Sequence, residues 1–114
     1  MKHEKFKVIQ FIREFIIIID KQMEDFPKKD IEIKNKIRMN SYDLLELGYK
    51  ENSIENIEHK KEIIVEMIAK IKVIDFLINL AYDKKILTQK KYTKFGEKAD
   101  DIVRYASGWL ESLK

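Results

Sequence analysis

The sequence predicts an all-α protein, an up-down-up-down left-handed four-helix bundle that forms a single domain over residues 1–114. Glycine occurs three times and proline once, and such scarcity of helix breakers favours long helices joined by short turns. Apolar residues recur at alternating spacings of three and four, which is the period of helices packed in a left-handed bundle. The many isoleucines would suit strands, but periodicity is the stronger signal. A chain of this length can bury one core.

The first helix is expected from about Glu4 to Asp25, because Phe26-Pro27 ends the helical pattern. Its main buried seam is expected at Ile9, Ile12, Ile16, Ile19 and Met23. Val8, Phe11, Phe15 and Ile18 line a flanking stripe, and Ile17 falls outside both stripes. The excess predicts a second apolar face used between subunits. The alternative is a helix that is deeply packed within one bundle.

The second helix is expected from Asp30 or Ile33 to Lys50, and Gly48 or Asn52 could supply the left-handed residue that ends it. Ser53 is expected to cap the third helix, since a hydroxyl at that position accepts from a free backbone N–H. The third helix should then run from about Ile54 to Lys84. Its main apolar seam is expected at Ile64, Met67, Ile71, Ile74, Ile78 and Ala81.

The fourth helix is expected to begin after Thr88 as its cap, with Leu87 and Tyr92 at the spacing of a hydrophobic staple. Its apolar seam continues in steps of three and four through Tyr92, Phe95, Ala99, Ile102, Ala106, Trp109 and Leu113. Three short turns between four helices require alternating directions. The first and third turns should therefore lie at the same end of the bundle.

Charge is concentrated in the segments expected at that end, although the whole chain carries only +3. Segment 21–38 has six basic and four acidic residues, and segment 82–98 has six and two. A basic end attracts polyanions by neutralising phosphates and releasing counterions. Lysine provides point charges rather than base-reading forks, so weak sequence preference and strong salt dependence are expected. The alternative is a solvated lysine-rich turn. The candidate nucleic-acid-binding lysines are Lys28, Lys29, Lys34, Lys84, Lys85, Lys90, Lys91 and Lys94.

Residues that could support catalysis or bind a metal are scarce. The chain has no cysteine and two histidines; His3 lies near the terminus, and His59 lies on an expected exposed face. No Glu-x-x-His pair and no phosphate-binding glycine loop occurs. We therefore expect no enzyme activity, no metal and no cofactor. The apolar run Phe15–Ile19 is too short for a membrane span or an export signal, so a cytoplasmic protein is expected.

Several short stretches, taken in order, resemble a known family. They are Phe26-Pro27-Lys28, Ile37-Arg38, Leu44-Leu45-Glu46-Leu47, Leu80-Ala81-Tyr82-Asp83, Leu87 with Tyr92, and Arg104 with Ser107-Gly108-Trp109-Leu110. Over residues 26–113 the chain resembles Avd, the accessory variability determinant of diversity-generating retroelements. It is also similar to the four-helix bundles encoded in intervening sequences of 23S ribosomal RNA genes.

The resemblance to Avd implies a barrel-like homopentamer that binds a reverse transcriptase and presents a basic surface to RNA or DNA. Such proteins assist mutagenic reverse transcription without performing catalysis. Arg38 and Arg104 match family positions, where they could bind nucleic acid or pair helices. The chain departs from the family at Asp75 and Asn79, where relatives often carry arginine, and at Ser107, where a second glycine is common.

Two other interpretations stay open. One is an oligomeric bundle of the intervening-sequence type, with no transcriptase and an undefined role. The other is a protein-interaction module whose lysines serve only solubility. Trp109 is expected in the core rather than as a platform for stacking bases.

Overall fold

The computed structural model describes residues 2–113, with side chains from residue 5 onward, and this part of the chain is helical without strands. The elements are α1 (Lys2–Gln22), a 3-10 turn η1 (Lys28–Asp30), α2 (Ile31–Glu51), α3 (Ile57–Asp83) and α4 (Gln89–Ser112). The all-α class predicted from the spacing is therefore confirmed, with four α-helices in an elongated body of 44 × 21 × 19 Å.

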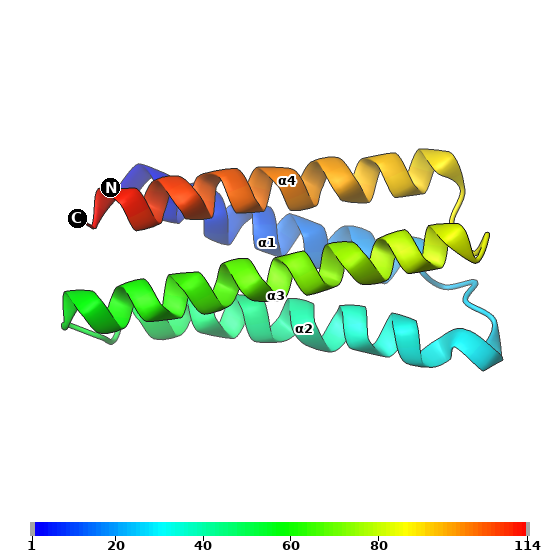
Figure 1. Ribbon diagram of the computed structural model, residues 1–114, viewed down its shortest axis with the longest axis horizontal. Helices are drawn as coiled ribbons and strands as arrows, with labels where there is room; N and C mark the ends of the chain where they lie inside the picture. Colours follow the sequence, from blue (N-terminus) through cyan, green and yellow to red (C-terminus); the bar gives the residue numbers. More distant parts are fainter. Residues whose placement is uncertain (1, 114) are drawn as a thin grey trace.

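The four helices lie side by side, and each packs against two neighbours (Figure 1). Helices α1 and α3 both pack against α2 and α4, so α1 and α3 occupy opposite corners of the body. The connections α1–α2 and α3–α4 lie at one end, and the connection α2–α3 lies at the other end, close to both chain termini (Figure 1). Helices α1 and α3 run in the same direction.

The core follows the predicted seams in α3 and α4, but it is shifted in α1. Ile12, Ile19 and Met23 are buried as predicted, whereas Ile9 and Ile16 are only half-buried. Val8 and Phe15, which were expected only to flank the seam, are fully buried instead. Both apolar stripes of α1 have spacings of three and four, so the sequence pattern does not decide which stripe is buried. That depends on the helices that α1 packs against. The Phe15 ring meets the Phe95 ring of α4 edge-on, with centroids 6.5 Å apart.

The predicted cap at Thr88 is confirmed, since its Oγ1 accepts a hydrogen bond from the Lys91 N–H at 3.2 Å. The predicted cap at Ser53 is wrong. Asn56 caps α3, with Oδ1 accepting from the His59 N–H at 2.9 Å, while the Ser53 hydroxyl donates to the carbonyl of Lys50. The cap is therefore the Asn56 amide, three residues after Ser53, and α3 begins at Ile57 rather than at about Ile54.

The prediction of a left-handed residue at Gly48 or Asn52 is also wrong. Asn52 has φ −62°, and no glycine within residues 2–113 has positive φ. Gly48 is buried inside α2, where a Cβ atom would collide with the end of the Ile9 side chain. Position 48 therefore carries glycine because α1 and α2 approach closely there and leave little room for a side chain.

A buried carboxylate ties three helices together at the end that holds the termini. Glu51 is 2% exposed, and its Oε1 lies 3.1 Å from the Lys5 ammonium of α1. The Lys60 ammonium of α3 lies 3.2 Å from Oε2 and also donates to the Glu51 carbonyl at 3.1 Å. Oε1 accepts no hydrogen bond of good geometry from the described residues. The charge of Lys5 is therefore what offsets the burial of this oxygen.

Candidate nucleic-acid interface

The basic end is defined here as the surface formed by residues 21–38 and 82–98. Its two connections, α1–α2 and α3–α4, lie at the same end of the molecule (Figure 1). The structure brings the eight predicted lysines to this end: Lys28 and Lys29 in η1, Lys34 in the first turn of α2, Lys84 and Lys85 after α3, and Lys90, Lys91 and Lys94 in the first two turns of α4.

Two of these lysines hold the basic end together. The Lys84 ammonium lies 3.3 Å from Oδ1 of Asp30, a carboxylate that is 8% exposed at the start of α2. The Lys91 ammonium donates at 3.0 Å to the carbonyl of Gln22, the last residue of α1. These contacts join α3 to α2 and α4 to α1. Lys84 and Lys91 therefore have structural roles beside any role in binding.

Five of the remaining predicted lysines are free to contact a ligand. Lys28, Lys29, Lys85, Lys90 and Lys94 are exposed and make no ion pair or side-chain hydrogen bond with any described residue. We call these five residues the free lysines. Half-buried Lys34 also has no partner of this kind within residues 5–113. Unpaired ammonium groups from three chain segments thus surround one end, which is the arrangement that attracts a polyanion.

Lys85 lies in an unusual backbone conformation. Its φ is 65°, and it is the one non-glycine residue with positive φ in the described chain. The Lys85 N–H bonds to the carbonyl of Tyr82 and the Ile86 N–H to that of Ala81, each at 2.9 Å. These two bonds form a Schellman motif, which ends a helix and usually places glycine at this position. A lysine there costs about 1 kcal/mol in backbone conformation, so the charged side chain replaces the residue that the turn favours.

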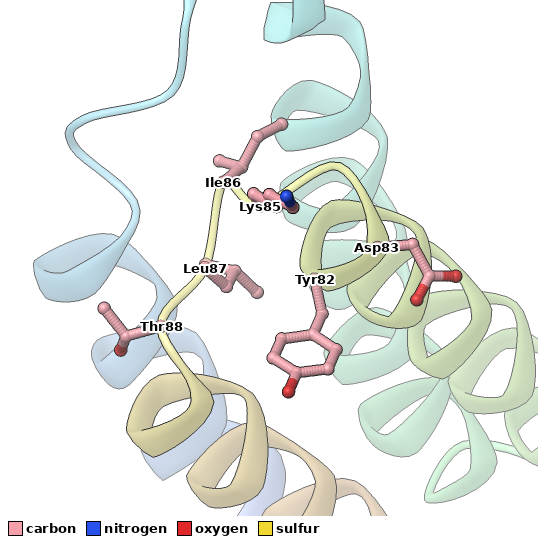
Figure 2. A pocket seen from close by; sticks show the side chains of 6 residues that line it. All are labelled: Tyr82, Asp83, Lys85, Ile86, Leu87 and Thr88. Atoms are coloured by element: carbon pink, nitrogen blue, oxygen red, sulfur yellow. The ribbon is translucent and has the colours of Figure 1, made fainter.

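A hollow of about 430 Å³ lies beside this turn and is lined by Tyr82, Asp83 and residues 85–88 (Figure 2). Leu87 points toward Tyr82, while Asp83 points away from it (Figure 2). The Tyr82 ring stacks on the Tyr92 ring of α4, with centroids 4.1 Å apart and planes 10° apart. Both tyrosines are half-buried and each ring covers one face of the other, so this pair joins α3 to α4 beside the lysines. The sequence pattern does not reveal this pairing, because Tyr82 and Tyr92 lie on different helices.

The two arginines expected from the family resemblance make contacts within the chain. Arg38 donates to the Tyr42 hydroxyl at 3.1 Å and lies 3.5 Å from Asp20 of α1. The hydrogen bond to Tyr42 is the main reason why the Arg38 pKa is raised above its ordinary value, so Arg38 stays charged.

Arg104 lies outside the basic end. It donates to Asp101 at 3.0 Å and stands 5.1 Å above the Tyr105 ring. Lys90 is fourteen residues earlier in the same helix, which places the two about 21 Å apart along the axis of α4. Arg104 cannot share a short ligand with the free lysines.

The positions where Avd proteins often carry arginine form no cationic surface on α3 of this chain. The Asn79 side-chain oxygen accepts a hydrogen bond from the Tyr92 hydroxyl. Partial burial, and then the charge of Asp100 on α4, raise the pKa of Asp75. Trp109 is 2% exposed, which confirms the prediction that it belongs to the core.

Comparison of the chain with protein-family models, curated proteins and solved structures found no match. None of the helices described is both long enough and apolar enough to cross a membrane. Within the described residues, no three His, Asp or Glu side chains are grouped as metal ligands would be. The arguments for a function therefore rest on the geometry of the basic end and on the sequence resemblance.

Proposed function

We propose that this protein is a non-catalytic accessory protein of a diversity-generating retroelement. In this proposal it is an up-down-up-down left-handed bundle that assembles into a cytoplasmic homo-oligomer, a pentamer if it follows the Avd family. The oligomer binds RNA or DNA through the basic end and docks a reverse transcriptase. It supports mutagenic reverse transcription by holding template and transcriptase together rather than by chemistry of its own.

The observation that carries the nucleic-acid part is the set of five free lysines around one end. Twelve basic and six acidic residues lie in the two segments that form this end. The strained conformation of Lys85 adds support, because residues kept in unfavourable conformations cluster at functional sites. Lysine point charges favour phosphate contacts over base readout, so binding to many sequences is expected.

A salt-titrated RNA-binding measurement tests this part. We expect affinity to fall steeply as salt rises, and the slope of log affinity against log salt to decrease by about one for each phosphate contact removed. The double variant Lys85→Glu with Lys90→Glu should bind at least tenfold more weakly. The matched control is Lys50→Glu with Lys61→Glu, which changes the charge equally outside the basic end. Equal losses in both variants would show that only net charge matters.

The transcriptase part is tested by co-purification with a reverse transcriptase encoded in the same locus. A stable complex would support the accessory role. If the protein binds RNA but no transcriptase, the bundle encoded in ribosomal intervening sequences becomes the better interpretation. If reversing Lys85 and Lys90 leaves RNA affinity unchanged, the lysines serve solubility and the protein is an interaction module.

A further inference from the structure

The outward faces of α1 and α3 expose large apolar side chains. On α1, Phe6 is 70% exposed and Ile17 is 55% exposed. On α3, Val65, Val73 and Phe76 are 54%, 50% and 63% exposed. Helix α4 exposes no large apolar side chain among the described residues. The uncovered apolar surface therefore includes two opposite corners of the body, because α1 and α3 both pack against α2 and α4 but not against each other.

The charges beside these two apolar faces have opposite sign. On α1, exposed Arg13 and Lys21 continue the stripe of Phe6 and Ile17 at helical spacing. On α3, exposed Glu62 and Glu66 flank Val65, and exposed Lys72 lies next to Val73. Neither Arg13 and Lys21 nor the two glutamates form an ion pair with any described residue. The α1 face is thus apolar and basic, and the part of the α3 face around Val65 is apolar and acidic.

The two faces also match in height along the bundle. Lys5 of α1 and Lys60 of α3 both contact Glu51, which places these two residues at similar heights. The helices run in the same direction (Figure 1), so Arg13, eight residues after Lys5, lies at the height of residue 68. Glu66 is two residues away, about 3 Å along the axis. By the same count Ile17 lies at the height of residue 72, adjacent to Val73.

We propose that α1 of one copy packs, parallel and without axial shift, on α3 of a second copy of this chain. Sideways displacement of one copy would then bring Arg13 to Glu66 and Ile17 to Val73. Since the two faces lie on opposite corners, each pair leaves one α1 face and one α3 face open. Such head-to-tail contacts close into a ring or extend into a chain. This inference deepens the proposed oligomeric scaffold by naming the two surfaces that form it.

Two variants that each block one face test the arrangement. Arg13→Glu with Ile17→Glu blocks the α1 face, and Val73→Glu with Phe76→Glu blocks the α3 face. Both blocked faces are then acidic and repel each other. Sedimentation velocity without nucleic acid should show an oligomer for the natural chain and monomers for each variant alone. An equimolar mixture should form a dimer of twice the monomer mass and nothing larger, because only one competent pair of faces remains. The altered side chains are exposed, so helix content by circular dichroism should be unchanged.

A charge swap provides an independent control. Arg13→Glu alone and Glu66→Arg alone should weaken association, and the two together should restore it, since every interface then has the opposite pairing. A natural chain that stays monomeric overturns the proposal. The proposal is also overturned if either variant alone self-associates, if the mixture stays monomeric, or if the charge swap does not restore assembly. RNA binding by the monomeric variants is measured separately, so failure of the interface is distinguishable from failure of the basic end.

Discussion

Replacing Glu51 by glutamine should destabilise the protein strongly, because this carboxylate is the meeting point of α1, α2 and α3. Its side chain is 3% exposed, and the ammonium groups of Lys5 and Lys60 lie 3.1 and 3.2 Å from its two oxygens. Removing one partner of a fully buried pair costs about 3–5 kcal/mol. Here the side chains of Lys5 and Lys60 are 28% and 18% exposed, so they regain some solvation. We therefore expect a loss of about 2–3 kcal/mol.

Urea denaturation followed by circular dichroism measures this loss. With a slope of about 1–3 kcal/mol per molar for a small domain, the midpoint should fall by roughly 1–2 M. Glu58→Gln is the matched control, since the Glu58 side chain is 79% exposed beside Lys61 and its pair should contribute less than about 0.5 kcal/mol. Replacing all three members of the cluster by apolar residues of similar size should recover most of the loss. If Glu51→Gln and Glu58→Gln have the same midpoint, the reasoning about the buried cluster is refuted.

Three further predictions concern local structure. Lys85→Gly should raise the free energy of unfolding by about 0.5 kcal/mol, because relief at φ 65° exceeds the added flexibility of the unfolded chain, while RNA affinity falls; lower stability would contradict this. Gly48→Val should lose about 1–3 kcal/mol by forcing α1 and α2 apart, and Gly48→Ala much less, since only the flexible end of Ile9 must move; equal losses would argue against close packing. Because burial and Asp100 raise the pKa of Asp75 in the folded state, its ionisation opposes folding at neutral pH, so Asp75→Asn should be more stable than the natural chain at pH 7. Unfolding curves across acidic pH should show that advantage shrinking as pH falls through the folded pKa, and an advantage independent of pH would contradict the assignment.

Much of the fold was predictable because helices depend on local pattern. The steps of three and four from Phe95 to Trp109 identified α4 and its buried face, and Thr88 identified its start. The gathering of the eight predicted lysines at one end could also be predicted. Short turns between helices leave few ways for the chain to run, so the first and third turns lie at the same end. The sequence did not identify the cap of α3, because the side chains of Ser53 and Asn56 can both cap a helix. Only Asn56 accepts a hydrogen bond from a free N–H group of α3.

Local pattern alone was enough for the helical class, the position of the helices and the gathering of lysines near two turns. Packing between helices decided the rest. It selected Val8 and Phe15 over Ile9 and Ile16 for the core, paired Tyr82 with Tyr92, and separated the free lysines from Lys84 and Lys91. Periodicity records which residues share a face of one helix, whereas burial and pairing depend on which side chains the neighbouring helices bring within contact distance.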